Sequence, residues 1–340
     1  MSMVFSIKDS LRQSVEAASG GKNTVLYDDK GNPSVMVVIP RFKLSDIDST
    51  WSNSYHPAFD VNGVSKKEIF ISKYHNVVYD NRAYSIPGVD PRTSVNFDQA
   101  KSYCENKGDG WHLFSNAEWS AVALWSLKND TQPRGNNCWG CDYSCTWERG
   151  VIADETVLHD GKFTRTKTGS GPDTWSHDHT PFGIFGLNGN IWDWVSGMKM
   201  KDGKMWVVGD NGVARNNFRT SESYGSTNGF IDLGYSYNSS SNIVSGANEN
   251  DGKYYGKVFK SITGGTTLMQ QLCLAPVTDS TLSARLKSDY FYHQDTHDER
   301  IPLRGGAWND QSSAGLFYLH LHYARSLSSW IAGFRAAYIS

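Results

Sequence analysis

A stretch of alternating side chains near the C-terminus, residues 316–323, constrains the fold of this chain more directly than any other feature. Apolar Phe317, Leu319 and Leu321 fall on one face of an extended chain, because successive side chains of a strand point to opposite sides. We therefore predict a strand whose apolar face packs on a core, while its second face is available for contact. That second face carries Tyr318, His320 and His322.

Helical and extended patterns both occur along the chain, which favours an α+β fold. Residues 68–74 alternate like a strand, whereas residues 96–107 place apolar side chains on one helical stripe. Ser115 and Glu118 have the spacing of a capping box and predict a second helix that begins there. Residues 130–181 and 201–256 are rich in small and polar side chains, and we predict that they are long loop insertions.

The first fifty residues differ from the remainder. Residues 5–19 have the pattern of a short amphipathic helix, with Leu11 and Val15 one turn apart. A turn at residues 28–32 then separates two strand-like runs. Because this piece is too small to fold alone, we predict an extension over residues 1–50, for attachment or oligomerisation, before one domain over residues 51–340.

Charge and hydropathy exclude two classes of partner. The formal net charge of −2 provides no electrostatic footprint for nucleic acid. No run of 18 apolar residues is present, so we expect no membrane insertion. The N-terminus lacks an apolar signal segment, which predicts synthesis in the cytoplasm without a signal peptide.

Five cysteines are present, and three of them are clustered. An odd number with this clustering is not typical of a disulfide framework. The spacing Cys138-x-x-Cys141-x-x-x-Cys145 could hold zinc, although no fourth ligand is obvious beyond His177 or His179 downstream. The alternative is a loop of reduced or opportunistically paired thiols.

Three segments carry a family resemblance by their order and spacing. They are SVNFDQAKSYC with LFSNAEW at residues 94–104 and 113–119, FGIFGLNGNIWDW at 182–194, and LRGGAW with GFR at 303–308 and 333–335. Together they resemble the formylglycine-generating-enzyme branch of the C-type lectin fold, over about residues 51–340 with long loop insertions.

The resemblance implies an enzyme scaffold without its chemistry. Copper-dependent oxidases of this family need a cysteine pair in the C-terminal segment, upstream of the Gly-Phe-Arg motif. Residues 304–340 contain no cysteine, so no thiolate is present there to act as nucleophile or metal ligand. The related sulfoxide-forming iron enzymes use a His-rich helical domain, which this chain does not show. We therefore expect a protein that is not an enzyme and has no cofactor, with a metal-dependent oxidase as the alternative.

A narrower likeness concerns the tail, residues 303–335, which resembles the variable segment of proteins diversified by retroelements. That likeness implies a fixed fold that displays hypermutated residues to a ligand. Adenine mutation of an Asn codon can produce all but one of the candidate residues; Gln311 is included as a neighbour in the same loop. Lys, Glu and Met, which such a codon cannot give, are absent between Ala307 and Ala332. The candidate ligand-binding residues are Ala307, Asp310, Gln311, Ser313, Tyr318, His320, His322, Tyr323, Leu327, Ser329 and Ile331.

Metal-binding interpretations of the same segments remain open. His320 and His322 could form a metal pair, but no third ligand is fixed by the sequence. Trp308-Asn309-Asp310 matches the calcium tripeptide of sugar-binding lectins, although its companion tripeptide is absent. A structural calcium is an option at the positions where relatives bind one, with a hydrogen-bonded turn as the alternative. Those positions are Asn188, Asn190 and Asp193.

The resemblance also implies a biological setting. Its best-known members are phage tropism determinants, so we expect a virion location at a tail-fibre tip and a host-cell surface protein or glycan as the ligand. A homotrimer would suit a fibre, and avidity would relax the need for tight single sites.

Overall fold

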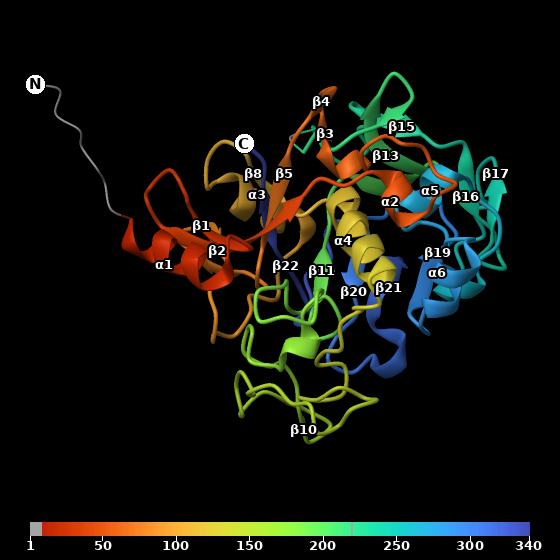
Figure 1. The fold of residues 1–340 in the computed structure, drawn as a ribbon. Helices are drawn as coiled ribbons and strands as arrows, with labels where there is room; N and C mark the ends of the chain where they lie inside the picture. Colours follow the sequence, from red (N-terminus) through yellow and green to blue (C-terminus); the bar gives the residue numbers. More distant parts are fainter. Residues whose placement is uncertain (1–8, 219) are drawn as a thin grey trace, which may run out of the picture.

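The computed structural model describes residues 9–218 and 220–340, and its first layer is a five-stranded antiparallel sheet. The order β1-β2-β5-β23-β8 brings strands from both ends of the chain into one sheet (Figure 1). The strands are β1 (Asn23–Tyr27), β2 (Pro33–Pro40), β5 (Glu68–Ser72), β23 (Ala336–Tyr338) and β8 (Trp111–Leu113).

This sheet spans the predicted boundary at residue 50. β2 pairs with β5 from Met36↔Ser72 to Pro40↔Glu68. The strands before the boundary are therefore part of the main domain's sheet, whereas their role in attachment or oligomerisation stays a prediction. α1 (Ser10–Ser19) precedes them, and Leu11 on its predicted apolar stripe is largely exposed. Residues 5–8 of the predicted helix lie outside the described residues.

The second layer is a six-stranded mixed sheet with the tail at its centre. Its order is β18-β19-β21-β20-β11-β22, and β19 and β20 flank β21 on its two sides. β21 is buried along its whole length, because a strand pairs with each of its edges and other residues cover both of its faces. The strands are β18 (Tyr254–Val258), β19 (Tyr290–Gln294), β21 (Gly315–Leu321), β20 (Leu303–Gly305), β11 (Trp192–Trp194) and β22 (Ala332–Phe334).

Two core helices each begin at a capping box. α3 (Phe97–Glu105) begins at Asn96, whose capping box is closed by Gln99. α4 (Asn116–Lys128) begins at Ser115, and the predicted box with Glu118 is confirmed. Because α4 is buried on nearly all sides, it is a core helix. The short helices are α2 (Leu44–Ile47), α5 (Thr267–Gln271), α6 (Ser280–Arg285), η1 (Pro57–Phe59), η2 (Asp173–Trp175), η3 (Phe259–Ser261) and η4 (Gln311–Ser313).

The two predicted loop insertions differ in content. Within residues 130–181 the regular elements are η2 and the small hairpin β9 (Leu158–His159) with β10 (Lys162–Phe163). The prediction for residues 201–256 was wrong, because that stretch contributes strands around β13 (Lys204–Asp210), where Met205 and Val207 are buried. The other strands of the molecule are β3 (Asp60–Val61), β4 (Val64–Ser65), β6 (Val77–Tyr79), β7 (Arg82–Tyr84), β12 (Met198–Lys201), β14 (Val213–Ala214), β15 (Phe230–Asp232), β16 (Tyr235–Tyr237) and β17 (Ile243–Ser245).

The architecture is a mixed α+β fold, as predicted from the sequence. Across residues 9–218 and 220–340, none of the helices has the length and apolar character needed to span a bilayer.

Candidate functional site

Two buried arginines hold the tail to the core. The Arg304 guanidinium donates to Asn116 Oδ1 at 2.6 Å and to the Cys273 carbonyl oxygen at 3.1 Å. The Arg335 guanidinium donates to Asp193 Oδ2 and to the Phe185 carbonyl oxygen, each at 3.0 Å. Charge-assisted bonds of this kind fix the two ends of the tail to the core. Both side chains are therefore structural.

Three of the candidate binding residues are buried. Ala307 is 0% exposed, and it belongs to the same buried hydrophobic cluster as Tyr318. His320 is 6% exposed. The prediction that the second face of this strand is available is therefore wrong for Tyr318 and His320, and Ala307, which lies before the strand, is buried as well. β21 lies between two other strands, and β11 brings Trp192 against its polar face.

The other candidate residues reach the surface in three groups. Gln311 is exposed beside half-buried Asp310 and Ser313 in the loop at η4. His322 and Tyr323 follow the end of β21 and are half-buried. A last loop carries half-buried Leu327, Ser329 and Ile331.

Rings from four parts of the chain join into one surface, which we call the aromatic platform. The ring centroids of His322 and Tyr323 are 4.2 Å apart, and His320 stacks on Tyr323 at 4.9 Å. Tyr254 lies 4.3 Å from His322 and is 52% exposed. Such rings provide rigid amphipathic contact area at a low cost in conformational entropy. The members of the platform are Trp192, Tyr254, Tyr292, His320, His322 and Tyr323.

Sequence reasoning missed the half of the platform that lies outside the tail. Tyr292 is the register partner of His320 across the parallel pair β19–β21, and their ring centroids are 5.1 Å apart. Tyr254 reaches the same surface from β18, which pairs with β19. The alternating Tyr290 and Tyr292 could have been recognised as a strand pattern, but their position beside the tail depends on the topology of the sheet.

The two histidines of the platform favour their neutral forms. Burial lowers the pKa of His320 to about 3, and the neighbouring His322 adds to the effect. Burial also lowers the pKa of His322, with a contribution from the charge of Arg300. The platform is therefore an uncharged aromatic surface at neutral pH.

Asp310 holds the tail loop against β11. Its Oδ2 accepts from the Trp192 indole nitrogen at 2.9 Å and from the Ala307 backbone nitrogen at 2.8 Å. Burial raises the pKa of this carboxyl. The carboxylate thus points inward, where it supports the loop; it does not face outward toward a ligand.

The insertion between α4 and β11 lies against the same end of the tail. His159 in β9 contacts the rings of Trp308 and Trp330 at 5.3 and 5.6 Å. Trp139 lies 6.4 Å from Trp308. Figure 1 shows the β9–β10 hairpin extending beyond the sheet at this end of the molecule. The insertion therefore borders the candidate surface.

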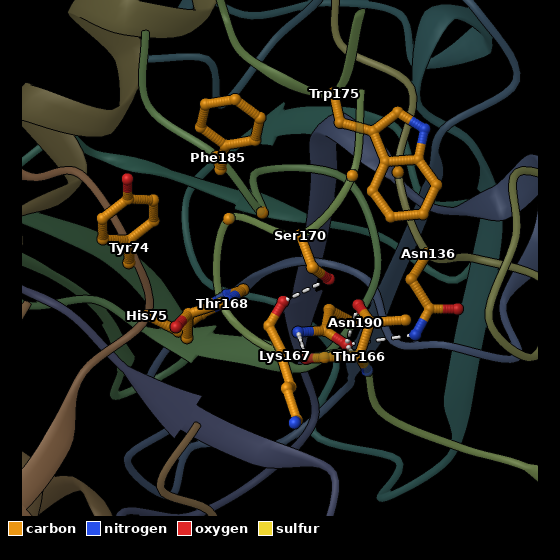
Figure 2. A pocket seen from close by; sticks show the side chains of 14 residues that line it. Tyr74, His75, Asn136, Thr166, Lys167, Thr168, Ser170, Trp175, Phe185 and Asn190 are labelled. Atoms are coloured by element: carbon orange, nitrogen blue, oxygen red, sulfur yellow. Dashed lines mark hydrogen bonds between the residues drawn. The ribbon is translucent and has the colours of Figure 1, made fainter. Parts of the chain in front are cut away.

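A small cavity lies behind this region, with aromatic rings at one side and polar side chains at the other (Figure 2). Its volume of about 20 Å³ suits a single buried water. Asn190 Oδ1, at its base, accepts from the Thr166 backbone nitrogen at 2.8 Å and from Asn136 Nδ2 at 3.0 Å. The cavity is far too small to hold a small organic molecule.

The side chains at the three positions considered for calcium already form polar contacts within the protein. Asn188 Oδ1 accepts from Asn137 Nδ2, and Asn190 Oδ1 accepts the bonds just described. Asp193 Oδ2 faces the Arg335 guanidinium and lies 3.4 Å from His75 Nε2. These contacts describe a hydrogen-bonded turn that anchors β11.

Metal-ligating side chains do not gather into a site in the part of the chain that the structure describes. There, no group of three or more His, Cys, Asp or Glu side chains is placed to hold an ion. His320 and His322 stack on each other at 5.3 Å, and Cys138, Cys141 and Cys145 are free thiols in the insertion.

Comparisons with known proteins give a family match and similar solved structures. A family model described as a sulfatase-modifying factor enzyme 1-like domain matches residues 8–269. No curated protein matches the chain. Among solved structures, PvdO from Pseudomonas aeruginosa is similar, with 14% identity, a TM-score of 0.33, and coverage of 93% of this chain and 98% of the other. Treponema denticola variable protein 1 is similar with 11% identity, a TM-score of 0.34 and the same coverage.

Proposed function

The chain belongs to the sulfatase-modifying factor enzyme 1-like family, with its C-type lectin-like fold, and we propose that it uses this fold to bind a ligand and not to catalyse a reaction. The binding surface is the aromatic platform together with the tail loops beside it, Asp310–Ser313 and Leu327–Ile331.

One observation carries the proposal. The platform is a continuous aromatic surface whose outer members are accessible, because Tyr254 is exposed and His322 and Tyr323 are half-buried. Its inner members stand on β21 and β19 within a buried sheet, so the backbone beneath it is rigid. Tyrosine-rich surfaces on rigid elements are typical of recognition sites.

The residues present do not fit the copper chemistry known in this family. That chemistry needs a cysteine pair in the C-terminal segment, and this chain has no cysteine after Cys273. Cys104 and Cys273 are fully buried in the core, and the other three thiols lie in the insertion. An oxidase reaction at the tail would therefore lack its nucleophile.

We further propose that the surface is diversified by a retroelement and recognises a protein or glycan on a host cell, from the tip of a phage or prophage tail fibre. The tail residues that reach the surface support the first part, because Gln311 is exposed and His322, Tyr323 and Leu327 are half-buried at the edge of the buried frame. A trimer on a fibre would add avidity.

Binding of the purified protein to a panel of intact bacterial cells, measured by flow cytometry, tests the proposal. We expect Tyr254→Ala combined with Tyr323→Ala to weaken binding by about tenfold or more, because tyrosine side chains often dominate the binding energy of such interfaces. Tyr79→Ala, at an exposed position in β6, is the matched control. Equal binding by all three proteins would contradict the proposed surface.

Metal analysis separates the enzymatic alternative. Copper or iron bound stoichiometrically to the purified protein, and lost in a variant with His320→Ala and His322→Ala, would overturn the proposal.

A genomic near-copy of the codons for residues 303–335, with mismatches confined to adenines, would support diversification.

A further inference from the structure

Cys138 and Cys141 close a tight turn in the insertion after α4. The Cys138 backbone nitrogen donates to the Cys141 carbonyl oxygen at 2.9 Å, and the reverse bond measures 3.3 Å. Between them, Trp139 has φ +50° and Gly140 has φ +95°. Two central residues with positive φ define a type I′ hairpin turn, whose twist matches that of paired strands.

The backbone of this turn already has the spacing of a disulfide. Residues that exchange two hydrogen bonds across an antiparallel pair have Cα atoms about 5.5 Å apart. Cα separations in disulfides are most often about 5.5–6 Å. The Cys141 thiol also reaches across the turn and donates to the Cys138 carbonyl oxygen at 2.9 Å. The backbone separation across the turn is therefore one that a disulfide can span.

The two thiols also differ in access. Cys138 is half-buried, so that a small reagent can reach it, whereas Cys141 is buried beneath the turn. The third cysteine of the insertion, Cys145, has separate partners: its backbone nitrogen donates to Asp142 Oδ1, and its sulfur accepts from the Ser144 hydroxyl. Cys138 and Cys141 are therefore the pair that the local geometry selects.

The turn supports the tail directly. The Trp139 backbone nitrogen donates to the Trp308 carbonyl oxygen at 2.8 Å. The Gln311 backbone nitrogen donates to the Asn137 carbonyl oxygen at 2.9 Å. Both ends of the loop from Trp308 to Gln311 are thus tied to backbone atoms within or next to the Cys138–Cys141 turn.

We propose that Cys138 and Cys141 are an oxidisable dithiol site, which becomes an intrachain disulfide by exchange with a small disulfide such as oxidised glutathione and then stiffens the tail loop. Formation of the disulfide does not depend on the proposed function. An effect of the disulfide on ligand binding rests on the proposed function.

The exchange is balanced in two steps. The Cys138 thiolate attacks one sulfur of oxidised glutathione, forms a mixed disulfide and releases one glutathione thiolate. The Cys141 thiolate then attacks the Cys138 sulfur, the intrachain bond forms, and the second glutathione leaves. Two protein thiols are oxidised, one glutathione disulfide is reduced to two thiols, and the protons pass from the cysteines to the glutathione.

The test is equilibration of the full chain in glutathione buffers of increasing oxidised fraction, followed by acid quench, alkylation and peptide mass spectrometry. We expect Cys138 and Cys141 to escape alkylation, and their peptide to weigh two hydrogen atoms less than the form in which both are unalkylated thiols. Cys145, Cys104 and Cys273 should be alkylated after denaturation. Cys145→Ser is the matched control and should oxidise in the same way.

Three outcomes would overturn the proposal: a bond that includes Cys145, persistent alkylation of both Cys138 and Cys141, or protection of the thiols by added Zn²⁺ alone. The last result would identify a metal site at the three cysteines.

Amide hydrogen exchange tests the coupling to the tail independently of any ligand. Oxidation should slow exchange at the Trp139 and Gln311 amides, and Cys138→Ser should abolish the difference between buffers. Because the ring closed by the disulfide spans only four residues, global stability should change little. Unchanged exchange at Gln311 in the oxidised protein would overturn the coupling, whether or not the platform binds cells.

Discussion

At the residue scale, His320 shows how burial turns a polar side chain into part of an aromatic core. Its ring contacts Trp192, Tyr292 and Tyr323. Nδ1 is buried and has no hydrogen-bond partner among the described residues. A charged imidazolium there would lose its hydration without compensation, so the fold favours the neutral ring.

Protonation of His320 should therefore destabilise the protein in acid. Its pKa is lowered from 6.5 to about 3, so the folded state binds fewer protons than the unfolded state as the pH falls below 6.5. The stabilising contribution is complete above pH 6.5 and declines as the pH falls toward 3. Between pH 7 and pH 5 the loss from this residue alone should be about 2 kcal/mol.

Denaturant unfolding at several pH values measures this loss. His320→Phe keeps a ring in the cluster and removes the titration, so its unfolding free energy should fall by about 2 kcal/mol less than that of the wild type over the same range. His322→Phe is the matched control, and its pH profile should differ less from that of the wild type, because His322 is only half-buried. Parallel pH profiles for the wild type and His320→Phe would refute the assignment.

At the element scale, α4 connects local capping to the position of the tail. The Ser115 hydroxyl accepts from the Glu118 backbone nitrogen and donates to Asn216 Oδ1 at 2.8 Å. The Glu118 carboxylate accepts from the Ser115 backbone nitrogen and faces His112 Nε2 at 2.9 Å. Because Asn116 also holds Arg304, the first turn of α4 supports β20 as well.

Loss of the cap should destabilise the whole domain. We expect Ser115→Ala to lower the unfolding free energy by about 1–2 kcal/mol, since it removes an N-cap and leaves buried polar groups unpaired. Ser115→Thr keeps the hydroxyl and should recover part of the loss. Thermal and denaturant unfolding measure both variants, and a cost below about 0.5 kcal/mol would show that the cap is dispensable.

At the scale of the whole molecule, strands from the two ends of the chain complete one sheet. β23 pairs with β5 and β8, and β5 in turn pairs with β2. The N-terminal strands therefore contribute to the same core as the tail. Met36 illustrates this, because it is fully buried in the cluster that also contains Phe334 and Tyr318.

Truncation of Met36 tests whether the first fifty residues belong to the domain. Met36→Ala should lower the unfolding free energy of the whole protein by about 2–5 kcal/mol in a single transition. Leu11→Ala, at a largely exposed position in α1, should cost less than about 0.5 kcal/mol. If the main unfolding transition of Met36→Ala kept the wild-type free energy, residues 51–340 would fold without this segment.

The sequence by itself determined the fold class, the cap of α4, the extended tail and the lack of tail cysteines, because these depend on local periodicity, short-range hydrogen bonding and composition. Only the tertiary structure decided which tail side chains are accessible. Alternation separates two faces of β21 but cannot show that Trp192 and Tyr292 cover the second one, since those contacts join residues far apart in the chain. For the same reason, the sequence did not reveal that Tyr254 joins the platform or that the Cys138–Cys141 turn holds the tail loop.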